Sequence, residues 1–186
     1  MSRRKREAGH EAAWPTGAEL ARLLAVLVAA VVLQTTAAPH FRLWGAYPDF
    51  ALLAVVAVGL LRGAEAGAVF GFFTGMLSGI ALMEPFGLSA FVLVLVGYLA
   101  GRYAETSDAG AGHVPFVAVL AAAFVSQVLL ATAQFLLSRE VPAGFFLGQV
   151  LAPSLLLEAL LAVPAYLAVR AALRGGGEAS VARVAR

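Results

Sequence analysis

The 186-residue chain contains no cysteine. It therefore has no disulfide framework, no thiolate nucleophile and no cysteine metal site. Its three histidines lie far apart, and HEAAW at residues 10–14 lacks the HExxH spacing of zinc proteases. The chain also has no G-x-S-x-G nucleophile elbow and no phosphate-binding loop. These absences argue against an enzyme and against a metal or other cofactor.

Charged residues are scarce as well. They make up 13% of the chain, whereas soluble domains carry about 25%. Hydrophobic residues make up 61%, and the mean hydropathy is +0.88. Too few charges remain to coat a water-facing surface, which indicates a protein embedded in lipid. The basic residues form no concentrated face, so a nucleic-acid-binding role is not expected.

Long apolar runs fill most of the sequence. A helix that spans a membrane needs about 20 residues, and two of the runs are shorter than this. Together they predict an all-α, polytopic membrane protein with a bundle of six transmembrane helices. The runs cover residues 20–38, 49–62, 63–82, 88–102, 114–137 and 152–173.

The distribution of arginine and lysine predicts the orientation. With six spans and the N-terminus inside, eleven of the thirteen basic residues fall on the inner side, and only Arg42 and Arg139 fall outside. The positive-inside rule produces such a bias. We therefore expect a basic cytoplasmic tail at residues 1–19, a transmembrane domain at residues 20–173 and a second cytoplasmic tail at residues 174–186.

Glycine recurs at every fourth position in GLLRGAEAGAVFGFFTGMLSG, residues 59–79. Residues four apart share one face of a helix, so these glycines predict a groove without side chains. Another helix can pack closely into such a groove. The helix could belong to the same chain or to a partner protein, and the sequence leaves both open. The candidate packing residues in the third run are Gly67, Gly71, Gly75 and Gly79.

Asp49 stands at the start of the second apolar run, directly after Pro48. Aspartate is a favoured N-cap because its carboxylate accepts hydrogen bonds from the free N–H groups of the first turn. Asp49 is therefore predicted to cap a helix. A role in an interface with a partner is the alternative.

Glu158 is an ionisable residue within the last apolar run, PSLLLEALLAVPAYL. Acidic residues inside a membrane are candidates for function. We interpret Glu158 as a structural group that hydrogen-bonds to a neighbouring helix, and a proton-carrying role is the alternative. Gln34, Gln127 and Gln134 are expected to form interhelical hydrogen bonds.

The order of these features resembles the MreD family of bacterial rod shape-determining proteins. The resemblance covers about residues 20–172. It rests on LQTT at the end of the first run, PDFALL at the start of the second, GAVFGFFTGMLSG, PFGLSAFVLVLVGYLAGR and PSLLLEALLAVPAYL. The chain departs from the family pattern at Ser78 and Gly79, where an acid is common, and at Glu158, where asparagine is common.

The resemblance implies a non-enzymatic component of the cell-elongation machinery in the bacterial inner (cytoplasmic) membrane. Its implied partners are an MreC-like membrane protein, an MreB-like filament, a RodA-type glycosyltransferase and a penicillin-binding transpeptidase. It also implies a fold like the substrate-binding subunit of energy-coupling-factor vitamin transporters, and such a transporter subunit is the alternative function. That alternative requires a polar pocket, for which the candidate ligands are Asp49, Glu84, Gln127 and Glu158. A scaffold for another envelope complex is a third possibility.

Overall fold

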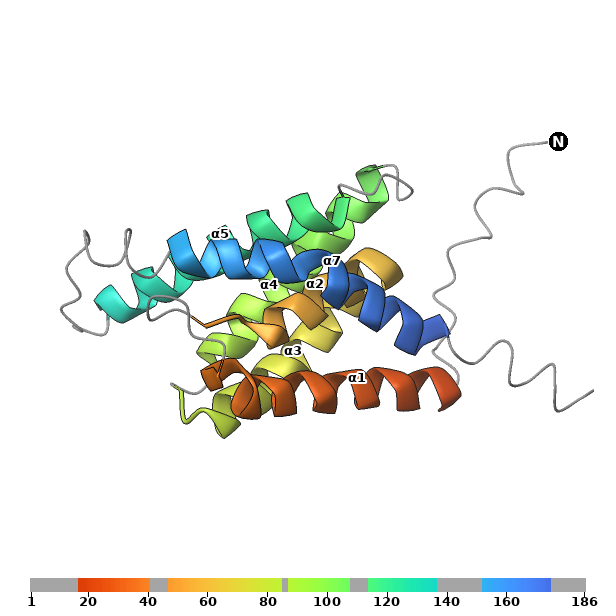
Figure 1. The fold of residues 1–186 in the computed structure, drawn as a ribbon, viewed down its shortest axis with the longest axis horizontal. Coiled ribbons are helices and arrows are strands. Elements are labelled where there is room, and N and C mark those ends of the chain that lie inside the picture. The colour runs from red at the N-terminus through yellow and green to blue at the C-terminus, as the bar shows by residue number, and fades with distance from the viewer. Residues whose placement is uncertain (1–16, 41–46, 85–86, 108–113, 137–151, 175–186) are drawn as a thin grey trace, which may run out of the picture.

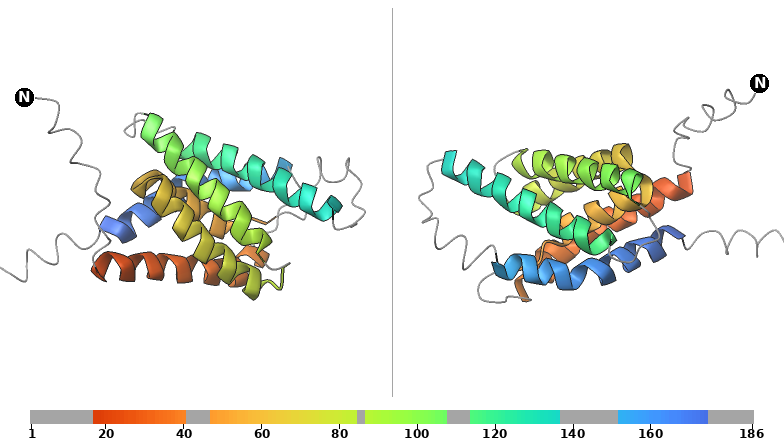
Figure 2. Two further views of the ribbon diagram at one scale, coloured as in Figure 1. Left: turned by 180° about the vertical axis from the view of Figure 1, so that it is seen from behind. Right: turned by 90° about the horizontal axis from the view of Figure 1, so that it is seen from above.

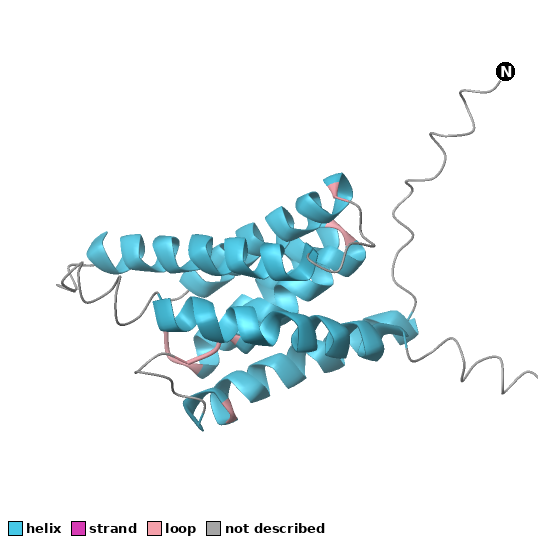
Figure 3. Cartoon of the chain, turned by 45° about the horizontal axis from the view of Figure 1, so that its top comes forward, coloured by secondary structure: helices cyan, strands magenta, loops and turns pink. Residues whose placement is uncertain are grey.

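The structure is a computed structural model that describes residues 17–40, 47–84, 87–107, 114–136 and 152–174 (Figure 1). Within these ranges every regular element is helical, as Figure 3 shows. The all-α prediction is therefore confirmed. The elements are α1 (Gly17–Thr36), the 3₁₀ turn η2 (Ala38–His40), α2 (Phe50–Arg62), α3 (Ala64–Ala81), α4 (Leu88–Thr106), α5 (Val114–Leu136) and α7 (Ala152–Arg174).

Five of these helices are long and apolar enough to cross a membrane, namely α1, α3, α4, α5 and α7. The fourth apolar run was expected to end at Arg102, but α4 continues to Thr106 and reaches 19 residues. The second run is different, because α2 has only 13 residues. At 1.5 Å per residue it is about 20 Å long, which is less than the ~30 Å hydrocarbon core. The prediction was six spans, of which the second and fourth runs were short. The structure has five helices of spanning length, α4 among them, and one shorter helix, α2.

The helices alternate in direction, so both ends of the described chain lie at one end of the bundle (Figure 1). Arg22, near the start of α1, donates a hydrogen bond of 3.2 Å to the carbonyl oxygen of Leu173, near the end of α7. The end of α2 lies there too, because Arg62 forms an ion pair of 3.4 Å with Glu19. The antiparallel order expected from six apolar runs is present even though α2 is short.

The short helix α2 forms the centre of the bundle. It contacts α1, α3, α4, α5 and α7, and residues 51–59 are all buried. An α-helix that is apolar on every face is typical of a buried position. Because its neighbours surround α2, its length does not have to match the thickness of the bilayer.

Glycines bring α2, α3 and α4 into backbone contact. Figure 2 shows α3 and α4 lying along one another. A Cβ atom added at Gly59 would lie 2.7 Å from the carbonyl oxygen of Gly97, and one added at Gly67 would overlap the same carbonyl. Added Cβ atoms at Gly71 and Gly75 would overlap the backbone of Leu93 and Ala90. At these positions the helices approach more closely than any side chain allows.

A single residue connects α2 to α3. Gly63 ends one helix and begins the next, with φ of 90° and ψ of 179°. Residues with a side chain rarely adopt positive φ, so glycine is favoured here. The first N–H group of α3, on Ala64, donates a hydrogen bond of 3.3 Å to Glu105 at the end of α4. Glu105 in turn accepts a bond of 2.6 Å from Arg102, so α4 holds the α2–α3 corner in place.

We predict that Gly71→Ala destabilises the protein by about 1–3 kcal/mol, because the added methyl group would force α3 and α4 apart. Gly79→Ala is the matched control. Its Cβ would lie 3.9 Å from Ser89, an ordinary contact, and alanine favours the helix by up to about 1 kcal/mol. Thermal unfolding of the two variants in detergent measures the difference, and equal melting temperatures would contradict the packing described for Gly71.

Candidate functional site

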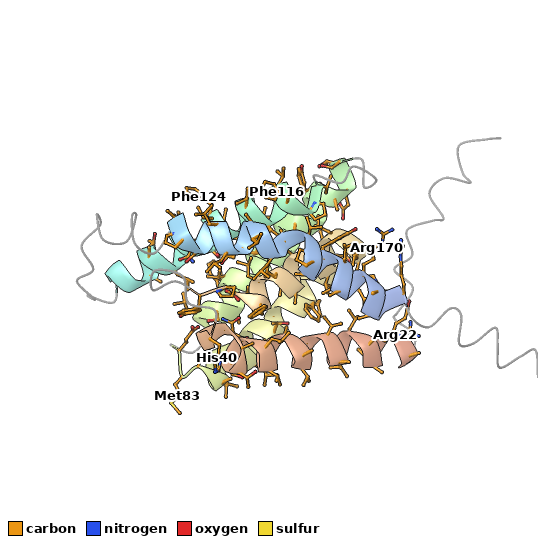
Figure 4. All side chains as sticks on the ribbon, in the orientation of Figure 1. Arg22, His40, Met83, Phe116, Phe124 and Arg170 are labelled. Carbon is orange, nitrogen blue, oxygen red and sulfur yellow. The ribbon has the colours of Figure 1, made fainter. Side chains whose placement is uncertain are left out.

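The two ends of the bundle differ in charge. All five arginines of the described ranges, at positions 22, 62, 102, 170 and 174, lie at the end where α1 begins and α7 ends, which we call the basic end. The opposite end, which we call the acidic end, carries Asp49 and Glu84. The two carboxylates are close enough for their charges to interact. Figure 4 shows Arg22 and Arg170 at the basic end and His40 and Met83 at the opposite end.

At the acidic end Asp49 is the N-cap of α2. Its carboxylate accepts a hydrogen bond of 3.0 Å from the backbone N–H of Leu52, and its backbone is extended. The preceding Pro48 is fully buried. Burial raises the pKa of the Asp49 carboxyl, the bond from Leu52 lowers it, and the nearby Glu84 raises it. Asp49 therefore has the capping geometry predicted from the sequence, and a role in partner docking stays a prediction.

Gln34 of α1 provides the remaining support for the start of α2. Its Oε1 accepts hydrogen bonds from the backbone N–H groups of Phe50, at 2.7 Å, and Ala51, at 3.4 Å. The first four N–H groups of any helix lack partners within the helix. Asp49 and Gln34 together satisfy three of them. This matters more for α2 than for the other helices because α2 begins inside the bundle.

Sequence reasoning expected Gln34 to form an interhelical hydrogen bond, and the structure contains that bond. It did not identify the backbone of α2 as the partner. A short apolar helix that begins inside a bundle needs acceptors for its first N–H groups. The shortness of the second run could therefore have indicated that a polar side chain of another helix caps it. Gln127 is half-buried and forms no hydrogen bond with the described residues, while the side chain of Gln134 lies outside them.

Glu158 of α7 is 1% exposed, which makes it one of the most deeply buried side chains described. Its Oε2 has no hydrogen-bond donor within the described ranges, so the expected bond from a neighbouring helix is not formed by that atom. The hydroxyls of Thr74 and Ser78 on α3 are likewise buried without partners there. Glu158 is therefore placed by packing and not by a bond from its Oε2 to another helix.

Glu84 and Ser89 close the turn between α3 and α4. The Ser89 hydroxyl donates a hydrogen bond to the Glu84 carboxylate. The sequence analysis named Glu84 only as a candidate ligand and did not predict this bond. Met83 before it has a φ of 53° and is 94% exposed, so an apolar side chain projects from the acidic end.

The glycines proposed for partner packing occupy two environments. Gly67, Gly71 and Gly75 are buried against α4 of the same chain. The sequence left open whether the helix that packs on these glycines belongs to the same chain or to a partner. At these three positions it is α4 of the same chain. Gly79 is half-buried and has room beside Ser89.

A small cavity lies between α4 and α5 and has a volume of about 130 Å³. Its lining is entirely apolar and combines Val96, Leu99, Ala100 and Tyr103 with Val117, Ala118, Ala121, Ala122 and Val125. The four side chains that a vitamin pocket would use do not line it. Drug-sized ligands occupy sites of about 300–1,000 Å³. The cavity fits an apolar segment better than a polar ligand.

No group of three or more histidine, aspartate or glutamate side chains in the described part of the chain is arranged to hold a metal ion. Asp49 accepts a hydrogen bond from the backbone at the start of α2, and Glu84 accepts one from Ser89. Both acidic side chains thus stabilise the ends of helices.

Comparison with known families gives one match. The sequence model of the family described as "rod shape-determining protein MreD" matches residues 18–175, which is most of the chain. No curated protein and no solved structure matches it. Apart from Gly17, the first residue of α1, the matched range contains all six helices longer than a single turn that the structure describes.

We predict that Gln34→Leu destabilises the protein by about 1–3 kcal/mol, because the N–H groups of Phe50 and Ala51 would be left without an acceptor. Gln127→Leu is the control and should change the stability by less than about 0.5 kcal/mol. Chemical unfolding in detergent gives both values. A similar loss in both variants would show that Gln34 has no special role at the start of α2.

We predict that Glu158→Gln does not lower the melting temperature. Glutamine has nearly the same shape and carries no charge, and the Oε2 atom that it replaces accepts no hydrogen bond from the described residues, so the substitution breaks no contact there. The exposed Glu65 provides the control as Glu65→Gln, which should leave the melting temperature unchanged. A drop confined to Glu158→Gln would mean that the carboxylate makes a stabilising contact, for example with a bound cation.

Proposed function

Because the chain belongs to the MreD family of rod shape-determining proteins, we propose that it is a non-enzymatic component of the bacterial cell-elongation complex. In this proposal it links cytoskeletal filaments to peptidoglycan synthesis through helix packing with membrane partners. The match over residues 18–175 carries the proposal. The helical, apolar architecture supports it, since five helices are able to cross a membrane.

The proposed location is the inner membrane, with the basic end in the cytoplasm. The arginines of all described ranges gather at that end, and the positive-inside rule assigns such an end to the cytoplasm. The tails at residues 1–19 and 174–186 extend from helices that begin and end there, so both termini are proposed to be cytoplasmic. An MreB-like filament would then meet the basic end, and the enzymes of wall synthesis would act beyond the acidic end.

The glycine contacts limit where a partner can bind. Since α4 packs against Gly67, Gly71 and Gly75, a partner helix has to use the outer faces of the bundle. We propose the cavity between α4 and α5 as the docking groove. Ala100, Ala118, Ala121 and Ala122 line it, and small residues let transmembrane helices approach closely.

The proposed occupant of this groove is the membrane anchor helix of an MreC-like protein. The lining is apolar, so the occupant must be apolar at this depth. The groove lies beside residues 96–103 of α4 and 117–125 of α5, so apolar side chains of an anchor helix that packs against α4 and α5 can enter it. The RodA-type glycosyltransferase and its transpeptidase join through further contacts of the same complex.

We predict that Ala121→Leu lowers the amount of co-purified MreC-like partner about tenfold, because the larger side chain fills the groove. Ala121 is exposed, so the variant is expected to fold. Ala29→Leu is the matched control, since Ala29 is an exposed alanine in the middle of α1. It should retain full co-purification, and both variants should keep the melting temperature of the wild type.

The same co-purification tests Asp49, which we propose shapes the docking surface at the acidic end. If Asp49→Asn and Asp49→Ala both retain the partner in full, the acidic end takes no part in docking. Restoration of rod shape in cells that lack their own MreD tests the function itself. Round cells despite normal membrane levels of the wild-type chain would contradict it.

A further inference from the structure

Three of the five described arginines at the basic end form no ion pair with an acidic residue of the described ranges. Arg62 pairs with Glu19 at 3.4 Å, and Arg102 pairs with Glu105 at 2.6 Å. Across the described ranges, no carboxylate lies within ion-pair distance of the other three, Arg22, Arg170 and Arg174. Among the described residues, the arginines that form no ion pair therefore all lie on α1 and α7.

These three side chains gather where α1 begins and α7 ends. Arg22 donates its hydrogen bond to the carbonyl oxygen of Leu173, which ties the two helices together. Arg170 lies three residues before Leu173, on the same face of α7, and Arg174 follows one turn after Arg170. Figure 4 shows Arg22 and Arg170 at the same end of the bundle.

Arg170 has an unused hydrogen-bond donor. Its Nε is buried and finds no acceptor within the described structure. Arg22 and Arg170 are half-buried, whereas Arg174 is exposed. A guanidinium group that is partly withdrawn from water, with a free donor and like charges beside it, is suited to an anion that can accept several hydrogen bonds.

We propose that this cluster binds the phosphate of an anionic phospholipid. The cluster lies at the ends of two helices of spanning length, where lipid headgroups are found. The planar guanidinium group matches phosphate geometry, and basic pockets between transmembrane helices bind anionic headgroups. Leu20, Leu24 and Leu167 lie within about a turn of the arginines and are about half exposed, so they are available to the acyl chains.

The site is independent of the proposed docking groove. It lies on α1 and α7, whereas the groove lies between α4 and α5. It requires only that the protein is embedded in a membrane. A bound anionic lipid would screen the repulsion among the arginines and stabilise the contact between α1 and α7.

The test uses the full-length chain purified in a neutral detergent, with phosphatidylglycerol as the probe. Native mass spectrometry measures the lipid bound at increasing lipid concentration. We expect Arg170→Gln and Arg174→Gln each to weaken binding about fivefold, and the double variant about 25-fold, since each basic residue near the surface contributes by this amount. Arg174 is exposed and makes no hydrogen bond to the described residues, so Arg174→Gln is expected to fold even if Arg170→Gln does not.

Arg102→Gln is the matched control, because it removes the same charge from the same end at an arginine that is already paired. It should bind phosphatidylglycerol like the wild type. If Arg102→Gln weakened phosphatidylglycerol binding as much as the other variants do, the lipid would be held by general charge attraction and the proposed site would be wrong. Equal binding of phosphatidylcholine would overturn the preference for an anionic lipid. Competition by inorganic phosphate at the lipid's own concentration would show a free-phosphate site instead.

Discussion

Backbone contact among α2, α3 and α4 is the constraint on which the rest of the structure depends. In a membrane the hydrophobic effect does not drive helices together, so they associate through close packing and hydrogen bonds. Gly59, Gly67 and Gly97 bring the three helices to one point, and Gly71 and Gly75 continue the contact along α4. Each glycine lacks the side chain that would separate the helices.

The central position of α2 follows from this packing. A helix of 13 residues is too short to cross the bilayer by itself, and its unpaired N–H groups would be costly in hydrocarbon. Asp49 and Gln34 accept bonds from three of those groups, and Gly63 returns the chain directly into α3. A short, capped helix that is surrounded by five others forms the centre of the bundle.

The sequence predicted much of the fold and part of the site. Apolar runs, the family resemblance and the cap at Asp49 were all visible in it, because helix periodicity and capping are local properties. It did not predict that Gln34 supports α2, that Glu105 holds the α2–α3 corner, or that Glu158 would lack a hydrogen bond at Oε2. Each of these depends on which residues of another helix lie nearby. The distance between two helices in space cannot be read from their separation in the sequence.

The sequence by itself determined that this protein is embedded in lipid, that it is helical, and which faces of its helices carry glycine or arginine. Composition fixes the preference for lipid, and the spacing of residues fixes which of them share a face of one helix. Only the tertiary structure decided which helix each face meets. It placed α4 against the glycines of α3 and surrounded α2 with other helices. It also brought Arg22, Arg170 and Arg174 to one end of the bundle, where they form no ion pair with an acid of the described ranges. The physical reason is that packing between helices depends on the fit of whole surfaces, which no single segment encodes.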